Sequence, residues 1–187
     1  MEEEKKEKVN WKDEILDFVR MFLISAAVLL AVTHFIVQPI RVQGNSMYPT
    51  LHDNAVGFSN VLLYRLQGVD RFDVVVLYLE EKDEFLVKRI VGLPGETVEY
   101  KADQLYIDGE PVEEDFLDPD YVAGQKSQFE YFTGDFGPVT LGEDEYYALG
   151  DNRPYSSDSR YYGPFKKEQI RTKDAVILFP FSQIGVH

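Results

Sequence analysis

The sequence predicts a mainly β protein, in which an N-terminal transmembrane helix precedes an external β-rich domain with a small inserted β subdomain. Three observations predict this architecture. Residues 21–37 are apolar and uncharged, short runs of β-branched and aromatic residues recur after them, and Pro–Gly, Asp–Gly and Gly–Pro pairs separate those runs. A chain of 187 residues is long enough for one such domain.

The apolar run approaches the length of a membrane-spanning helix. Extended to Phe18 on one side and Ile40 on the other, it comes close to the ~20 residues that a bilayer crossing needs. A cleaved signal peptide would have a shorter apolar region and a small-residue cleavage site, and a buried core helix would show a polar stripe. We therefore expect an anchor over residues 18–38, with Pro39 ending the helix near Gln38.

Lysine and arginine set the expected direction of this anchor. Five basic residues precede the run, whereas Arg41 alone follows it closely; the five are Lys5, Lys6, Lys8, Lys12 and Arg20. Because basic residues collect on the cytoplasmic side, residues 1–17 should form a cytoplasmic tail and residues 39–187 an extracytoplasmic domain. The sequence thus predicts a single-pass protein of the cell membrane, with the lipid bilayer as one partner.

Strand patterns dominate the rest of the chain. Apolar or alternating runs predict strands at residues 72–79, 85–91, 97–100, 105–112, 146–149 and 175–179. Asp108–Gly109 lies between apolar flanks and predicts a hairpin turn. No useful helical period appears outside the N-terminus, apart from a short turn at residues 166–170.

Charge and composition exclude some classes of binding partner. The net charge of −14 argues against nucleic acid, which needs a basic surface. Residues 102–151 contain 14 acidic residues and one basic residue, Lys126. Most of this stretch, about residues 102–142, is interpreted as an acidic insertion with a solvated surface; a cation or substrate site is the alternative. The chain has no cysteine, and its three histidines are far apart, so we expect no metal site.

Ser46 and Lys88 are the candidates for chemistry. A serine hydroxyl needs a base to become a good nucleophile, and His52 is the one histidine nearby, so a Ser–His–Asp arrangement stays open. A neutral lysine can also serve, and burial lowers the pKa of a lysine. Lys88 lies in an apolar strand, where alternation sends it and Arg89 to opposite faces, so that one can point inward and the other outward.

The surroundings of Ser46 predict an exposed turn. Gly44 permits a substrate backbone to approach closely, and Pro49 stiffens the far side. A turn of this kind leaves backbone N–H groups free to bind an oxyanion. An ordinary structural turn is the alternative.

The segment at residues 150–160 combines acidic, basic and hydroxyl side chains. Asp151, Arg153, Asp158 and Arg160 can form two buried or half-buried ion pairs, which are usually structural. Ser156 can hydrogen-bond the lysine amine and hold it in place.

Three motifs, at residues 44–51, 88–95 and 150–160, resemble in content and order those of bacterial type I signal peptidases, the leader peptidase family, in the smaller single-anchor Gram-positive form. The resemblance implies a signal-peptidase-like catalytic domain with Ser46 as nucleophile, Lys88 as general base and the Ser46 backbone N–H in the oxyanion hole. Gly44 stands where some relatives have a serine donor, which leaves the second donor open. Ser156 matches the serine that contacts the lysine amine, and Asp151, Arg153, Asp158 and Arg160 match residues that shape the site.

The implied activity is that of a membrane-bound serine endopeptidase that removes signal peptides from secretory preproteins after Ala-x-Ala sites, through an acyl-enzyme. It implies no metal or cofactor, and the export translocon as a further partner. Phe72 and Tyr162 depart from residues common in the family. Two alternatives are a self-cleaving Ser–Lys repressor peptidase, disfavoured by the anchor and acidic charge, and a catalytically silent membrane-tethered assembly module of the same fold.

Overall fold

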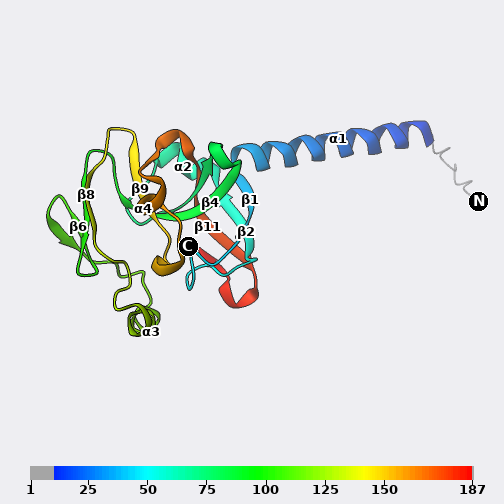
Figure 1. Ribbon diagram of the computed structural model, residues 1–187. Helices are drawn as coiled ribbons and strands as arrows, with labels where there is room; N and C mark the ends of the chain where they lie inside the picture. Colours follow the sequence, from blue (N-terminus) through cyan, green and yellow to red (C-terminus); the bar gives the residue numbers. More distant parts are fainter. Residues whose placement is uncertain (1–10, 187) are drawn as a thin grey trace, which may run out of the picture.

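The computed structural model describes residues 11–186 and is mainly β, as the sequence predicts (Figure 1). Its helices are α1 (Trp11–Phe35), α2 (Val61–Gln67), α3 (Pro119–Phe129) and α4 (Ser159–Tyr162), with short 3₁₀ turns at Glu80–Lys82, Arg153–Tyr155, Lys167–Gln169 and Phe181–Gln183. Its strands are β1 (Val37–Arg41), β2 (Val56–Asn60), β3 (Val74–Leu79), β4 (Glu84–Gly92), β5 (Thr97–Lys101), β6 (Gln104–Ile107), β7 (Glu110–Val112), β8 (Phe136–Thr140), β9 (Glu145–Leu149), β10 (Phe165–Lys166), β11 (Ile170–Phe179) and β12 (Gly185–Val186).

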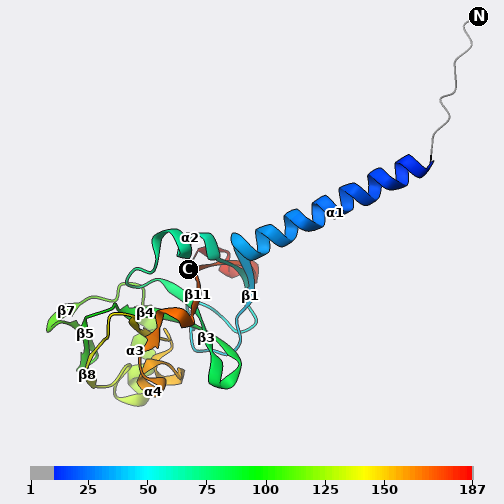
Figure 2. The ribbon, with the colours of Figure 1, turned by 90° about the horizontal axis from the view of Figure 1, so that it is seen from above.

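Helix α1 projects away from the β domain, and none of its residues is buried (Figures 1 and 2). It is long and apolar enough to cross a membrane. It ends at Phe35 rather than near Gln38. Pro39 instead lies in β1, which is an edge strand, where a residue without an N–H group costs no ladder hydrogen bond on the open side. Lys5, Lys6 and Lys8 lie outside the described residues.

The larger sheet carries the chemistry-bearing strand near its middle. Its order is β1-β2-β11-β3-β4-β9-β10, with β12 also paired to β11. Strand β4 therefore lies between β3 and β9, and every pairing is antiparallel. One buried cluster, with Leu77 and Ile90 at its centre, packs on this sheet and holds β4 rigidly.

The smaller sheet, in the order β7-β6-β5-β8, is built from the chain between β4 and β9. The hairpin expected at Asp108–Gly109 joins β6 to β7. A second buried cluster links the two sheets, because Val91 and Leu149 of the larger sheet pack with Val98 and Leu105 of the smaller one. Figure 1 shows the smaller sheet and α3 on the side of the domain far from α1.

Helices α2, α3 and the one-turn α4 were not expected from the sequence, and the two longer ones carry recognisable start signals. Asn60 caps α2 by accepting a hydrogen bond from the Leu63 N–H group, and Asp118 caps α3 in the same way, with Pro119 at the first helical position. Both helices are short, 7 and 11 residues, so that a hydrophobic period is hard to see. The short turn expected at residues 166–170 is the 3₁₀ turn Lys167–Gln169.

Candidate active site

Ser46 lies in a turn whose neighbouring residues pack into the hydrophobic core. Met47 and Leu51, which follow it in the motif, are both fully buried and pack in a third apolar cluster with Val42 and Ile177. Burial of these neighbours leaves the half-buried Ser46 at the surface of the domain, at the edge of a pocket. The sequence thus positions a hydroxyl group by anchoring the residues on its C-terminal side.

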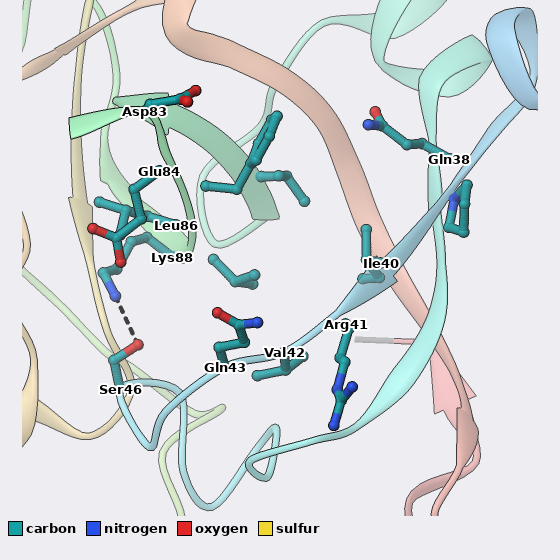
Figure 3. A pocket seen from close by; sticks show the side chains of 14 residues that line it. Gln38, Ile40, Arg41, Val42, Gln43, Ser46, Asp83, Glu84, Leu86 and Lys88 are labelled. Atoms are coloured by element: carbon teal, nitrogen blue, oxygen red, sulfur yellow. Dashed lines mark hydrogen bonds between the residues drawn. The ribbon is translucent and has the colours of Figure 1, made fainter. Parts of the chain in front are cut away.

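Lys88 lies on β4 and is 2% exposed. Its amine nitrogen Nζ lies 2.7 Å from Ser46 Oγ, and a hydrogen bond joins the two atoms (Figure 3). The two residues are 42 positions apart in the sequence. Ser46 Oγ makes no such bond to His52, whose ring instead contacts that of Tyr48 at a centroid distance of 4.9 Å.

Burial lowers the pKa of Lys88 to about 8, from a usual value of 10.5. Loss of water around the charged amine is the main cause, and nearby Arg160 adds to it. Asp158 and Glu84 act in the opposite direction and keep the pKa from falling further. At mildly alkaline pH a large fraction of Lys88 is therefore neutral, and a neutral amine can accept the Ser46 proton.

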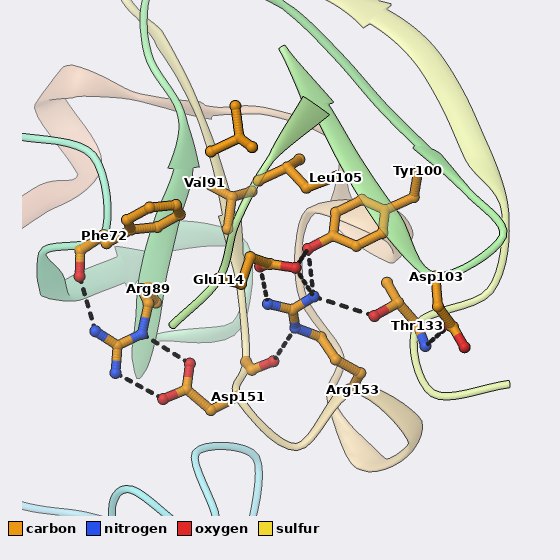
Figure 4. Close-up of polar contacts among 12 residues, drawn as sticks. Phe72, Arg89, Val91, Tyr100, Asp103, Leu105, Glu114, Thr133, Asp151 and Arg153 are labelled. Atoms are coloured by element: carbon orange, nitrogen blue, oxygen red, sulfur yellow. Dashed lines mark hydrogen bonds and ion pairs between the residues drawn. The ribbon is translucent and has the colours of Figure 1, made fainter. Parts of the chain in front are cut away.

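Arg89, the next residue along β4, is also buried, at 8% exposure. The expectation that one of this pair points outward is therefore wrong, because the segment between β4 and β9 covers the second face. The Arg89 guanidinium lies 4.1 Å from the ring centroid of Phe116 in that segment, and it donates to the Phe72 carbonyl (Figure 4). Both faces of β4 are thus buried at this point.

Asp151 connects the lysine strand to the serine turn. Its carboxylate accepts two hydrogen bonds from Arg89, at 2.9 and 2.7 Å, and one from the Thr50 hydroxyl at 2.6 Å. Asp151 is fully buried, so this ion pair lies in a region of low dielectric where its geometry is closely defined. Three segments far apart in the sequence are held together by one carboxylate.

Asn152 holds the backbone of the serine turn. Its N–H group donates to the Ser46 carbonyl at 3.0 Å, and its side-chain Nδ2 donates to the Asn45 carbonyl at 2.8 Å. The Ser46 N–H group makes no backbone or side-chain hydrogen bond within residues 11–186, so it is available to an incoming oxyanion. Sequence reasoning passed over Asn152, although it lies inside the third motif.

Gly150 permits the third motif to approach Ser46. A Cβ atom at this position would lie 2.3 Å from the Ser46 carbonyl oxygen and 2.2 Å from Ser156 Oγ, both far inside contact distance. Glycine is therefore required by close packing here. Ser156 lies against this glycine with its Oγ buried, and no hydrogen bond joins it to Lys88.

The four charged residues of the third motif form one ion pair within the motif and two ion pairs with residues outside it. Arg160 and Asp158 do pair, at 2.8 Å. Asp151 instead pairs with Arg89, and Arg153 pairs at 2.5 Å with Glu114 of the acidic insertion (Figure 4). Arg153 also donates to the hydroxyl groups of Tyr100 and Thr133. The insertion is therefore joined to the site by a buried ion pair, and its acidic residues are not all a solvated surface.

Asp158 illustrates how these charges are stabilised. Its burial acts to raise its pKa, but the Arg160 guanidinium and the Gly150 N–H group outweigh this effect, so that the pKa lies below its usual value. Asp158 is thus an anion at neutral pH, and its charge acts to raise the pKa of Lys88.

The sequence left open whether Gly44 supplies a second hydrogen-bond donor to the oxyanion. Its N–H group donates to the Asp53 carboxylate at 2.8 Å, so it is already occupied. Its backbone has φ +80, in the left-handed region that favours glycine. Gly44 therefore serves the shape of the turn in this structure.

Phe72 adopts an unusual backbone conformation that brings its carbonyl to Arg89. Phe72 has φ +72, a left-handed conformation that costs free energy for a residue with a Cβ atom. The conformation presents the Phe72 carbonyl to Arg89, at 2.8 Å. The Phe72 ring packs against Phe116 at a centroid distance of 5.0 Å, which offsets part of the strain.

A pocket of about 400 Å³ opens beside the hydrogen-bonded pair (Figure 3). It is lined by residues 38–43 on one side and 83–88 on the other, with Ser46 at one end (Figure 3); Val76 also contributes to the lining. Strand β1 is paired on one side, with β2, and β4 is paired with β9 from Arg89 onward. Two strand edges with unpaired backbone groups therefore face this pocket, a shape that suits an extended peptide. Within residues 11–186, no cluster of His, Asp and Glu side chains could hold a metal ion.

A serine hydroxyl bonded to a buried, low-pKa lysine beside a peptide-shaped groove defines a candidate serine peptidase. The family model described as Signal peptidase, peptidase S26, matches residues 15–179. The chain is 40% identical to signal peptidase I S of Bacillus subtilis (strain 168), covering 96% of this chain and 97% of that protein. It is 36% identical to signal peptidase IB of Staphylococcus aureus (strain COL), over 92% of this chain and 93% of that one.

The chain belongs to the signal peptidase S26 family and has the length and motifs of type I members. A crystal structure of a signal peptidase I from Enterococcus faecalis V583 is 38% identical in sequence to this chain, with a TM-score of 0.48. The match covers 56% of this chain and 95% of the crystallised chain.

Proposed function

We propose that this protein is a membrane-bound endopeptidase that removes signal peptides from secretory preproteins, with Ser46 as nucleophile and Lys88 as general base. The observation that carries the proposal is the 2.7 Å contact between Lys88 Nζ and Ser46 Oγ, made by a lysine that is 2% exposed and has a pKa of about 8. Family membership supports signal peptides as the substrate class.

The proposed reaction begins when neutral Lys88 takes the proton from Ser46 as Oγ attacks the carbonyl carbon before the scissile bond. The negative charge that forms on the carbonyl oxygen binds the Ser46 N–H group. Lys88 then gives its proton to the leaving amine, and the acyl-enzyme remains on Ser46. Lys88 next takes a proton from water, whose oxygen attacks the ester carbonyl. As the ester bond breaks, Lys88 returns that proton to Ser46 Oγ, which restores the Ser46 hydroxyl and the neutral amine; the carboxylic acid product leaves and ionises in water.

The groove supports an extended substrate that ends at Ser46. A peptide lying between β1 and residues 84–88 of β4 can hydrogen-bond both strand edges, which gives affinity without regard to sequence. Its alternate side chains face a wall that includes Ile40 and Leu86. The apolar side chains of this wall disfavour charged substrate side chains, and we propose that alanines of an Ala-x-Ala site pack against them.

The anchor supports access to preproteins at the membrane surface. Helix α1 would span about 37 Å at 1.5 Å per residue, somewhat more than the ~30 Å hydrocarbon core. We propose a single crossing with the N-terminus in the cytoplasm and residues 39–187 outside. The chain has no cysteine, so Ser157→Cys, at an exposed position, creates a unique thiol. A membrane-impermeant maleimide should label this thiol in intact protoplasts. Labelling that occurs only after the protoplasts are lysed would contradict this orientation.

Cleavage of a purified preprotein bearing an Ala-x-Ala site, by the full chain in detergent, tests the function. The wild type should cut after the second alanine, and Ser46→Ala and Lys88→Ala should not cut. A silent assembly module is the alternative: well-folded wild-type protein would then bind preproteins or other partners without cutting any of several preproteins tested. A Ser46→Ala variant as active as the wild type would contradict the Ser–Lys mechanism.

A further inference from the structure

The Tyr121 side chain of α3, in the acidic insertion, contacts the serine turn. We propose that Tyr121 is a positioning residue for Ser46, which acts through Asn152 and makes the insertion a brace for the catalytic turn. The kinetic part of this inference rests on the proposed function. Its structural part concerns the rigidity of residues 44–51 and can be measured without cleavage.

The contact consists of a short chain of hydrogen bonds. The Tyr121 hydroxyl donates to Asn152 Oδ1 at 2.8 Å, and Asn152 Nδ2 donates to the Asn45 carbonyl at 2.8 Å. The Asn152 backbone N–H group donates to the Ser46 carbonyl at 3.0 Å. Asn152 is 3% exposed, so water can replace few of its side-chain partners.

Geometry dictates how the Asn152 amide is oriented. A carbonyl oxygen accepts hydrogen bonds and cannot donate them, so the Asn45 carbonyl requires the NH₂ side of the amide. Oδ1 must then face α3, where Tyr121 supplies the donor. Without this hydroxyl, a buried acceptor would lose its partner, and the amide would be free to rotate away from Asn45.

The Tyr121 ring adds a second contact to the same turn. It packs edge to face on Tyr48, two residues after Ser46, at a centroid distance of 5.1 Å. Its position is set by the helix start, because the Asp118 carboxylate accepts a hydrogen bond from the Tyr121 N–H group at 2.8 Å. The side chain is therefore held at its backbone and at its hydroxyl, as a brace requires.

Tyr121→Phe isolates the hydroxyl, because it keeps the ring on Tyr48. Tyr131→Phe is the matched control: Tyr131 lies in the same insertion, is 56% exposed, and its hydroxyl makes no hydrogen bond within residues 11–186. With a peptide substrate, Tyr121→Phe should lower kcat about three- to tenfold with little change in KM, the scale of one lost hydrogen bond. Tyr131→Phe should match the wild type in both constants.

A double-mutant cycle tests the route through Asn152. If Tyr121 acts through the amide, adding Tyr121→Phe to Asn152→Ala should change kcat by less than about twofold. Losses that multiply in the double variant would overturn the proposed route. A Tyr121→Phe variant with wild-type kcat would overturn the kinetic inference while the wild-type activity, measured alongside, leaves the proposed function standing.

Hydrogen exchange gives a readout that needs no activity. In the full chain in detergent, Tyr121→Phe should speed amide exchange in residues 44–51, where the Tyr48 and Leu51 N–H groups are protected by the turn, and Tyr131→Phe should not. Exchange in β4 should stay unchanged in both variants, which separates loosening of the turn from global loss of stability. Unchanged exchange in residues 44–51 of Tyr121→Phe would overturn the brace.

Discussion

Arg89 and Asp151, 62 positions apart in the sequence, form a buried bidentate ion pair that connects the lysine strand β4 to the serine turn. Arg89 follows the candidate base directly, and Asp151 bonds Thr50 of the motif that contains the candidate nucleophile. The ion pair therefore helps to hold Lys88 and Ser46 together, although neither residue takes part in it. This arrangement explains why a charged pair with no chemical task occupies the centre of the site.

Asp151→Asn should destabilise the fold, because it leaves the Arg89 guanidinium buried without its counter-charge. Breaking a buried pair in this way typically costs about 3–5 kcal/mol in the free energy of unfolding. Urea unfolding followed by circular dichroism measures the loss. Asp144→Asn is the control, since Asp144 is exposed and forms no ion pair within residues 11–186, and it should change stability by less than about 0.5 kcal/mol. Equal effects of the two variants would contradict the prediction.

Lys88→Met and Lys173→Met should have opposite effects on stability, although both lysines are about equally buried. At pH 7 the charged Lys88 destabilises the fold because its pKa is lowered to about 8, so removal of the amine should stabilise by about 3 kcal/mol. Activity should fall more than about a thousandfold. Lys173 pairs with Asp73 at 3.0 Å, and its loss should destabilise.

The two lysine variants are compared by thermal unfolding. The stability gain of Lys88→Met should shrink as the pH rises from about 8 toward 10.5, because the wild-type folded state then no longer holds a charge that it disfavours. Stabilisation by both variants, or by neither, would show that the environments of the two amines are alike, against the contacts described above.

Activity should depend on pH through Lys88. Because the neutral amine is the proposed base, kcat/KM should rise about tenfold per pH unit below about 8 and level off above it. Glu84→Gln should move the midpoint to lower pH, since removal of a negative charge lowers the pKa of Lys88. Glu81→Gln, a change at an exposed carboxylate that is not among the main charges acting on Lys88, should move the midpoint much less. A rate flat down to pH 6 would contradict a lysine base.

Gly150→Ala should abolish most activity, because the new methyl group needs the space of the Ser46 carbonyl and Ser156 Oγ. The turn must shift, and displacement of a nucleophile by about 1 Å costs on the order of a hundredfold in rate. Gly124→Ala provides the contrast: a methyl group there, within α3, meets nothing within 4 Å and should stabilise the helix by roughly 0.5–1 kcal/mol. Steady-state kinetics and thermal unfolding of both variants check the pair.

Local sequence predicted the strand content well because burial on a sheet leaves a pattern in neighbouring residues. The runs at residues 72–79 and 85–91 correspond to β3 and β4, and the Asp–Gly pair marks the β6–β7 hairpin. Helices α2 and α3 were missed since each is short and signalled mainly by its cap, Asn60 or Asp118. Strands β1, β2 and β8 were missed as well, because Pro39, Gly57 and the Gly137–Pro138 pair interrupt their patterns; the Gly–Pro pair lies within β8 and does not form the expected turn. The two-residue strands β10 and β12 are too short to leave a pattern.

By itself, the sequence determined the apolar helix, the β-rich domain, and the two residues most suited to chemistry, since these depend on residue type and local pattern. Tertiary structure decided the partners: Lys88 with Ser46, Asp151 with Arg89, and Arg153 with Glu114. It also decided the lowered pKa of Lys88, because burial is a property of the whole fold. The local sequence around a charged side chain does not specify its partner in an ion pair, because contacts between residues distant in the sequence determine which charges meet.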